Sequence, residues 1–124
     1  MPFNIRIIHA HDFMKVTPEG QLDLQSSREL LIEIAANSAP LADHHILLDI
    51  RRAHSSLSVT DLYYLAGELN EHRKALSRRT AVLCPTEMFD FAGFFALCAQ
   101  NRGFPVSAFT SFEKAIEWLV EIES

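Results

Sequence analysis

The residue with the clearest potential for covalent chemistry is Cys84, which ends a predicted strand just before a predicted helix. A thiol phosphatase places its nucleophile at such a position, and it needs an arginine six residues later to hold the phosphate. Here that residue is Asp90, whose charge would repel the substrate. Because no paired base is apparent either, we interpret Cys84 as a small apolar residue near a strand end.

Asp49 lies near the end of another predicted strand, where a response-regulator receiver carries its phosphorylated aspartate. A receiver also needs an acidic pair after its first strand to bind magnesium, and a lysine after its last strand. Residues 9–12 contain one carboxylate, and residues 107–110 contain no lysine. We therefore expect Asp49 to hydrogen-bond nearby backbone.

Six histidines raise the question of a metal site. Five of them fall in or near predicted turns and loops, namely His9, His11, His44, His45 and His54. No carboxylate or cysteine completes an obvious ligand set, so we interpret them as solvated and expect no metal. The four glycines form no phosphate loop or dinucleotide fingerprint, so we expect no cofactor. With no nucleophile, base and acid brought together, the sequence predicts no catalytic residues and no enzyme.

The predicted helix over residues 88–102 is unusually apolar. One stripe at helical spacing suffices to cover a sheet, and it consists of Met88, Phe91, Ala92, Phe95 and Cys98. Phe89 and Phe94 then point elsewhere. Either adjacent helices bury them, or they belong to a partner surface or the wall of a small pocket.

The remaining pattern predicts the elements that hold these residues. Strands are expected over residues 3–8, 13–17, 45–50, 80–84 and 105–109, the last at a sheet edge because Pro105 lacks a donor. A turn is expected at residues 9–12 and another at 18–20. Besides the helix over residues 88–102, which Gly103 should end, helices are expected to begin at capping boxes: Ser26 with Glu29, Ser58 with Asp61, and Thr110 with Glu113.

The first helix should stop before residues 37–40, the second near Leu76, and the last should face inward with Phe112, Ala115, Ile116, Leu119 and Ile122. The order of elements predicts an α/β fold with a five-stranded mixed sheet and about four helices.

Composition sets the class of protein. The 124 residues are 48% apolar and 22% charged, which predicts one globular domain over residues 1–124. A net charge of −5 argues against nucleic-acid binding. No apolar run is long enough to span a membrane, and no signal peptide is apparent. Two cysteines are expected to stay reduced, so we expect a cytoplasmic protein.

Four segments resemble the SpoIIAA-like group of STAS domains, small bacterial proteins also labelled STAS/SEC14. Gly20-Gln21-Leu22-Asp23 is similar to the Gly-x-Leu-Asp after the second STAS strand, and Leu47-Leu48-Asp49-Ile50-Arg51 to the central strand. Arg79-Thr80-Ala81-Val82-Leu83 before Pro85-Thr86 is similar to the fourth strand and turn. The stretch over residues 109–119, which ends in Ala-Ile-Glu-Trp-Leu, is similar to the closing strand and helix.

STAS anti-sigma-factor antagonists carry a phosphorylated serine within Asp-Ser-Ser-Gly at the start of the second helix. The corresponding residues here are Ser55-Ser56-Leu57-Ser58-Val59-Thr60, without that aspartate or glycine. Ser58 matches the serine loosely, and we interpret it as a helix N-cap rather than a phosphorylation site.

The resemblance implies a non-catalytic regulatory or protein-interaction module that binds a protein partner or itself, and we expect a homodimer. The alternative is a carrier of a small apolar or lipid-like ligand held against the third helix. In both cases the candidate surface consists of Phe89, Phe91, Phe94 and Phe95.

Overall fold

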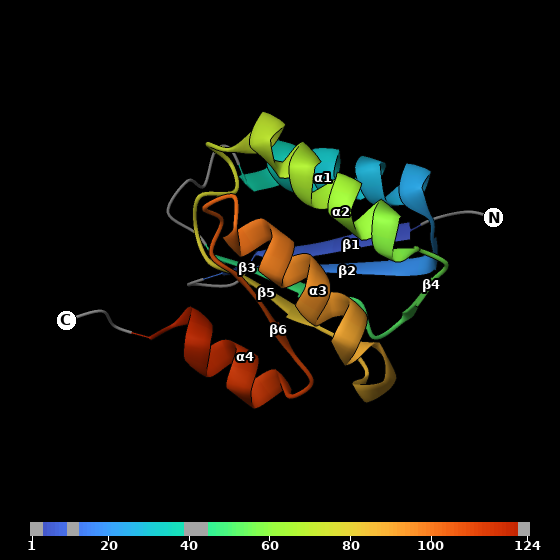
Figure 1. Cartoon of the computed structure of the whole chain (residues 1–124). Coiled ribbons are helices and arrows are strands. Elements are labelled where there is room, and N and C mark those ends of the chain that lie inside the picture. Colours follow the sequence, from blue (N-terminus) through green and yellow to red (C-terminus); the bar gives the residue numbers. More distant parts are fainter. Residues whose placement is uncertain (1–3, 10–12, 39–44, 122–124) are drawn as a thin grey trace.

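The computed structural model describes residues 4–9, 13–38 and 45–121 (Figure 1). Its strands are β1 (Asn4–His9), β2 (Phe13–Leu22), β3 (His45–Asp49), β4 (Ala53–Ser55), β5 (Thr80–Leu83) and β6 (Val106–Phe109). Its helices are α1 (Leu24–Ser38), α2 (Val59–Glu68), α3 (Phe89–Gln100) and α4 (Phe112–Leu119), with short 3-10 helices η2 (Leu69–His72) and η3 (Thr86–Met88). No helix in these ranges is both long and apolar enough to cross a membrane.

The strands form a mixed sheet in the order β1-β2-β3-β5-β6, which confirms the predicted fold class. β1 and β2 are antiparallel, and the remaining neighbours along this path are parallel. β6 lies at an edge, as the donorless Pro105 before it indicated. A short sixth strand, β4, was not predicted. It pairs with the end of β2, parallel to it, from Gly20 opposite Ala53 to Leu22 opposite Ser55.

Helices cover both faces of the sheet. α1, α2 and α3 lie over one face, and α4 lies alone on the other (Figure 1). Successive side chains of a strand point to opposite faces of a sheet, so neighbouring residues of β3 pack against different helices. Ile46 packs in the core beneath the three helices, whereas Leu47 packs in the second core with Ala115 and Leu119 of α4.

The predicted turn at residues 18–20 is wrong, because β2 continues through it. Pro18 lies opposite Ile5 of β1, and Glu19 lies opposite Asn4. In the described part of the chain neither β3 nor β4 pairs with residues 17–19, so a residue without an N–H is tolerated there. Gly20, with φ of 110°, takes a conformation that side chains disfavour where β2 leaves β3 and meets β4.

Two helix starts were predicted at the wrong residue. α1 begins before Ser26, because Asp23 and Ser26 form the reciprocal pair: the Ser26 amide donates to Asp23 Oδ1 at 2.8 Å, and the Asp23 amide donates to Ser26 Oγ at 3.0 Å. At α4 the N-cap is Ser111 rather than Thr110, and its hydroxyl accepts from the Lys114 amide. This register leaves Phe112 in the first turn exposed, contrary to its predicted inward position.

The other helix boundaries differ less. α2 ends at Glu68 and continues as η2, which stops before Leu76. Gly103, with φ of 88°, follows α3 as the predicted terminator. α1 continues through Asn37 to Ser38, so its predicted end before residue 37 is wrong, and His9 belongs to β1 rather than to the predicted turn. Several predictions lie outside the described residues: the strand start at Phe3, the turn at residues 10–12, and the inward position of Ile122.

Candidate functional site

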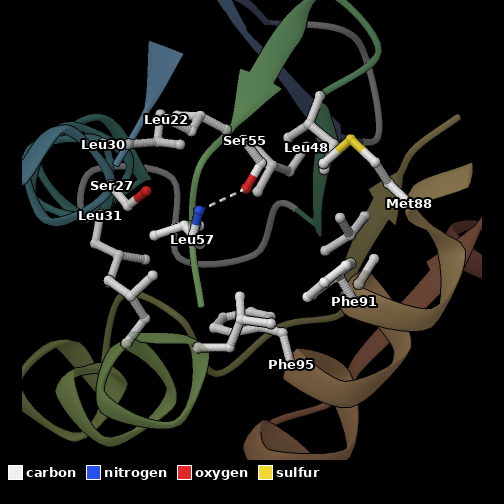
Figure 2. Close-up of a pocket in the computed structure, with 15 residues that line it drawn as sticks. Leu22, Ser27, Leu30, Leu31, Leu48, Ser55, Leu57, Met88, Phe91 and Phe95 are labelled. Atoms are coloured by element: carbon white, nitrogen blue, oxygen red, sulfur yellow. Dashed lines mark hydrogen bonds between the residues drawn. The ribbon is translucent and has the colours of Figure 1, made fainter. Parts of the chain in front are cut away.

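An apolar cavity of about 90 Å³ lies between α1, α2, α3 and the sheet (Figure 2). Leu30 and Leu31 of α1 form one wall, and Phe91 and Phe95 of α3 form another. The rest of the lining comes from α2, the strands and the adjoining loops: Leu22, Ser27, Leu48, Ile50, Ser55, Leu57, Leu62, Leu65, Val82, Met88 and Ala92. None of these described lining residues carries a charge. The cavity is therefore suited to an uncharged, mostly apolar occupant.

Two hydroxyls interrupt the apolar lining. Ser55 Oγ accepts a hydrogen bond from the Leu57 amide at 3.2 Å, drawn as the dashed line in Figure 2. Ser27 is only 6% exposed, and its Oγ has no hydrogen-bond partner among the described residues. Figure 2 shows the Ser27 hydroxyl pointing from α1 toward the cavity. A buried hydroxyl without a partner is uncommon, because its desolvation is not compensated.

The four aromatic residues of the candidate surface divide into two pairs. Phe91 and Phe95 line the cavity, and Phe91 remains partly exposed beside it. Phe89 and Phe94 do not line the cavity. Phe89 is 43% exposed, so its burial by adjacent helices does not occur, whereas Phe94 is half-buried.

Phe89 and Phe94 belong to what we call the α3 outer face: Phe89, Gly93, Phe94 and Leu97. Leu97 is 53% exposed and lies two helical turns beyond Phe89. Gly93 lies midway between them, and a side-chain Cβ at this position would meet nothing within 4 Å. The structure thus places two different apolar features on the two sides of α3: a partly open cavity and an exposed face.

Ser58 is the N-cap of α2, as predicted. Its Oγ accepts from the Asp61 amide at 3.1 Å, and its own amide donates to Asp61 Oδ2 at 3.0 Å. This capping box accounts for the serine at this position in structural terms. Ser58 is exposed, and its hydroxyl is engaged with the helix end rather than with the cavity.

Asp49 is buried on the α4 side and hydrogen-bonds backbone, as predicted, but it also holds two cations. Its Oδ1 accepts from the Arg51 amide at 3.1 Å, the Arg51 guanidinium binds both carboxylate oxygens, and Lys15 Nζ lies 3.9 Å from Oδ2. Burial alone would raise the pKa of Asp49. The hydrogen bonds and charges of Arg51 and the charge of Lys15 outweigh burial and hold this pKa below its ordinary value of 3.8.

The chemistry considered for Cys84 finds no support. Its thiol is buried, and burial together with the nearby charge of Glu87 raises its pKa, which disfavours the nucleophilic thiolate. Within the described ranges, no three histidine, cysteine or acidic side chains come together as a metal site. His45 Nδ1 accepts from the Arg79 amide, and His54 is exposed, whereas His11 and His44 lie outside the described residues.

Comparison with known proteins finds similarity to solved structures. No protein-family model and no curated protein matches the sequence. An anti-sigma factor antagonist from Mycobacterium paratuberculosis is similar in structure, with a TM-score of 0.63 and 15% identity over 95% of this chain and 94% of that one. SpoIIAA in its unphosphorylated form gives a TM-score of 0.56 at 16% identity, over 99% and 100%.

The third structure is an uncharacterised protein of the DUF3478 family from Shewanella loihica PV-4, itself described as SpoIIAA-like. It matches with a TM-score of 0.58 and 20% identity, over 94% of this chain and 93% of that one. This chain has a SpoIIAA-like fold. The resemblance seen in four short sequence segments therefore extends over nearly the whole SpoIIAA-like chain in space.

A small apolar pocket against the third helix was one of the alternatives raised by the sequence, but its walls from α1, α2 and the sheet were not predicted, and neither was Ser27. A signal for Ser27 exists, because it shares helical spacing with Leu30, Leu31 and Ile34 and is the one polar member of that stripe. A serine on the inner face of a helix is a reason to look for its hydrogen-bond partner.

Proposed function

We propose that this SpoIIAA-like protein is a non-catalytic regulatory module that acts by binding a protein through the α3 outer face, and that a second copy of the chain is the first partner to test. Two of its structural neighbours are described as anti-sigma factor antagonists, or as SpoIIAA acting in that role, which supports a regulatory rather than a catalytic reading. Their identity to this chain is low, so the proposal rests on the surface itself.

The observation that carries the proposal is Gly93. A glycine inside a helix costs roughly 1 kcal/mol relative to alanine. Nothing in the described part of the chain requires it, because a Cβ at Gly93 would meet no described atom within 4 Å. Close approach of another polypeptide to this point would require it, and the exposed apolar side chains of Phe89 and Leu97 flank the same point.

Sedimentation velocity over a range of concentrations tests the proposal with three variants. Phe89→Asp is expected to weaken self-association at least 30-fold, about 2 kcal/mol, because it places a charge in an apolar contact. Gly93→Ala is expected to raise the melting temperature, through better helix propensity, while weakening association. Ile32→Asp is the matched control, since Ile32 is also an exposed apolar residue but lies on a different helix, α1.

Two results would contradict the proposal in different ways. A native protein that stays monomeric at the highest attainable concentration excludes the second copy as the partner. A Gly93→Ala variant that gains stability and associates as well as the native chain removes the reason for placing any close contact at Gly93.

The second candidate function is a carrier of a small apolar or lipid-like ligand held against α3. The observation that favours it is the cavity lined by Phe91 and Phe95, on the opposite side of α3 from the α3 outer face. The two candidate functions use different residues of the same helix and can be tested separately.

A further inference from the structure

The Ser27 hydroxyl is the one polar side-chain atom in the described chain that is fully buried without a partner. The Ser27 amide is already used, donating to the Asp23 carbonyl at 3.0 Å as part of the first turn of α1. The hydroxyl is left with both its donor and its acceptor capacity unused. A group bound in the cavity beside it would recover the hydrogen bonding that folding removed.

A water molecule is a poor candidate for that group. A buried water needs two to four polar partners, and the side chains lining the cavity offer only Ser27 and Ser55. Ser55 Oγ already accepts from the Leu57 amide, so it offers a water mainly its O–H donor. A water held by Ser27 and Ser55 alone would have the minimum number of partners and would keep unused hydrogen-bonding capacity in an apolar cavity.

The absence of charged residues from the described lining limits the chemistry of the ligand further. No described residue of the lining is ionisable, so a carboxylate or an amine bound there would be desolvated without a counter-charge. The nearest chain neighbour of Ser27 with a charge is Arg28, which is exposed and holds Glu68 at 2.6 Å. The polar end of the ligand must accordingly be neutral.

The size of the cavity limits the enclosed part of the ligand. A cavity of roughly 150 Å³ holds benzene, so about 90 Å³ encloses about four non-hydrogen atoms by proportion. A larger ligand would extend past Phe91, whose ring is partly exposed beside the cavity. A ligand with a flat apolar part is suited to the opening beside Phe91, because Phe91 and Phe95 present aromatic surface there.

We propose that the cavity binds a small neutral alcohol or phenol, with its hydroxyl on Ser27 Oγ and its apolar body against Phe91 and Phe95. A hydroxyl both donates and accepts, as the unpartnered serine does. This assignment rests on the second candidate function, whose ligand class it specifies, and it is independent of the proposed protein-binding surface.

A matched pair of probes tests the assignment: 4-fluorophenol, and 4-fluorotoluene, in which a methyl group replaces the hydroxyl at nearly the same shape. Binding of each is measured by ¹⁹F NMR titration of the native protein, Ser27→Ala and the control Ser77→Ala. Ser77 is an exposed serine outside the cavity. Ser27→Ala is expected to weaken 4-fluorophenol about three- to tenfold and to leave 4-fluorotoluene unchanged or tighter.

Two further measurements distinguish an effect on probe binding in the cavity from an effect on folding. Without probe, Ser27→Ala should melt at or above the native temperature, because it removes an unsatisfied hydroxyl rather than a hydrogen bond. Leu57→Phe, which adds volume to the cavity wall, should exclude both probes. The assignment is overturned if the native protein does not bind 4-fluorophenol, if Ser27→Ala leaves the ratio of the two affinities unchanged, or if Leu57→Phe binds both probes as the native protein does.

Discussion

The two faces of the sheet are covered by different amounts of helix and are packed differently. On the α4 face the core is small and closed: none of its five members has measurable exposure, and they are Leu47, Ala81, Leu83, Ala115 and Leu119. On the opposite face three helices share a larger core, yet that core contains a cavity of about 90 Å³ and an unpaired hydroxyl. Close packing is the normal condition of a protein interior, so the cavity face is the exception.

Under the two proposals made above, the two faces should have different roles. Polar groups on the α4 face are paired: Asp49 holds Arg51 and Lys15, and Arg79 holds Glu121. On the cavity face the Ser27 hydroxyl has no partner among the described residues, and the Phe89 and Leu97 side chains of the α3 outer face are exposed. Substitutions on the α4 face should therefore act mainly on stability, and those on the cavity face should act mainly on binding.

The largest expected effect is on the free energy of unfolding, when a leucine on each face of the sheet is replaced by alanine. Leu119→Ala should lower the free energy of unfolding by about 3 kcal/mol, because it opens a void in a closed core. Leu31→Ala should cost about half as much, since Leu31 is half-buried and already borders empty space. Urea denaturation of both variants measures the difference, and equal losses would show that the two faces are packed alike.

The next effect concerns the buried carboxylate of the α4 face. Asp49→Asn should cost about 2 kcal/mol at neutral pH, because hydrogen bonds to a charged group are lost while Arg51 and Lys15 remain. The folded-state pKa of Asp49 lies below 3.8, so its stabilisation is complete above pH 3.8 and disappears as pH falls through the folded-state value.

Acid unfolding therefore gives a second measurement. The native protein should lose stability more steeply than Asp49→Asn as pH falls below 3.8, because the variant has no Asp49 carboxylate to protonate. Parallel acid titrations of the two proteins, followed by circular dichroism, would reveal this difference. Identical slopes would mean that the ion pairs of Asp49 do not stabilise the fold.

The smallest expected effect is the change in stability when Ser58, the N-cap of α2, is substituted. Ser58→Ala should cost about 1 kcal/mol by leaving the Asp61 amide without its acceptor, whereas Ser58→Asp should be nearly silent because aspartate also caps a helix. Thermal melts measure both. A phosphorylation switch would give another pattern: Ser58→Asp would fold normally and lose a partner that Ser58→Ala keeps.

Local signals predicted the order of the elements, the α2 cap and the edge position of β6, because each depends on residues a few positions apart. The extension of β2 through Pro18 and Gly20 was missed because pairing with two other strands outweighed local turn chemistry. Pro18 lies opposite Ile5 of β1, and Gly20 lies opposite Ala53 of β4, which is more than thirty residues away in the sequence. A pocket against the third helix was raised as an alternative, but its other walls were missed for a related reason. Leu22, Leu57 and Phe91 come together only after the helices dock, and sequence spacing says nothing about the volume left between them.

Trp118 has a practical consequence for all of these measurements. It is the single tryptophan of the chain and lies on α4, with the Arg79 guanidinium carbon 5.3 Å and the Phe109 ring 5.6 Å from its ring centre. Intrinsic fluorescence is thus a local signal for the docking of α4 on the sheet. A ligand in the cavity lies on the far side of the sheet and does not contact this chromophore. After correction for light absorbed by the ligand, a change in tryptophan emission on ligand addition would indicate a structural change on the α4 face, which provides an optical readout of communication across the sheet.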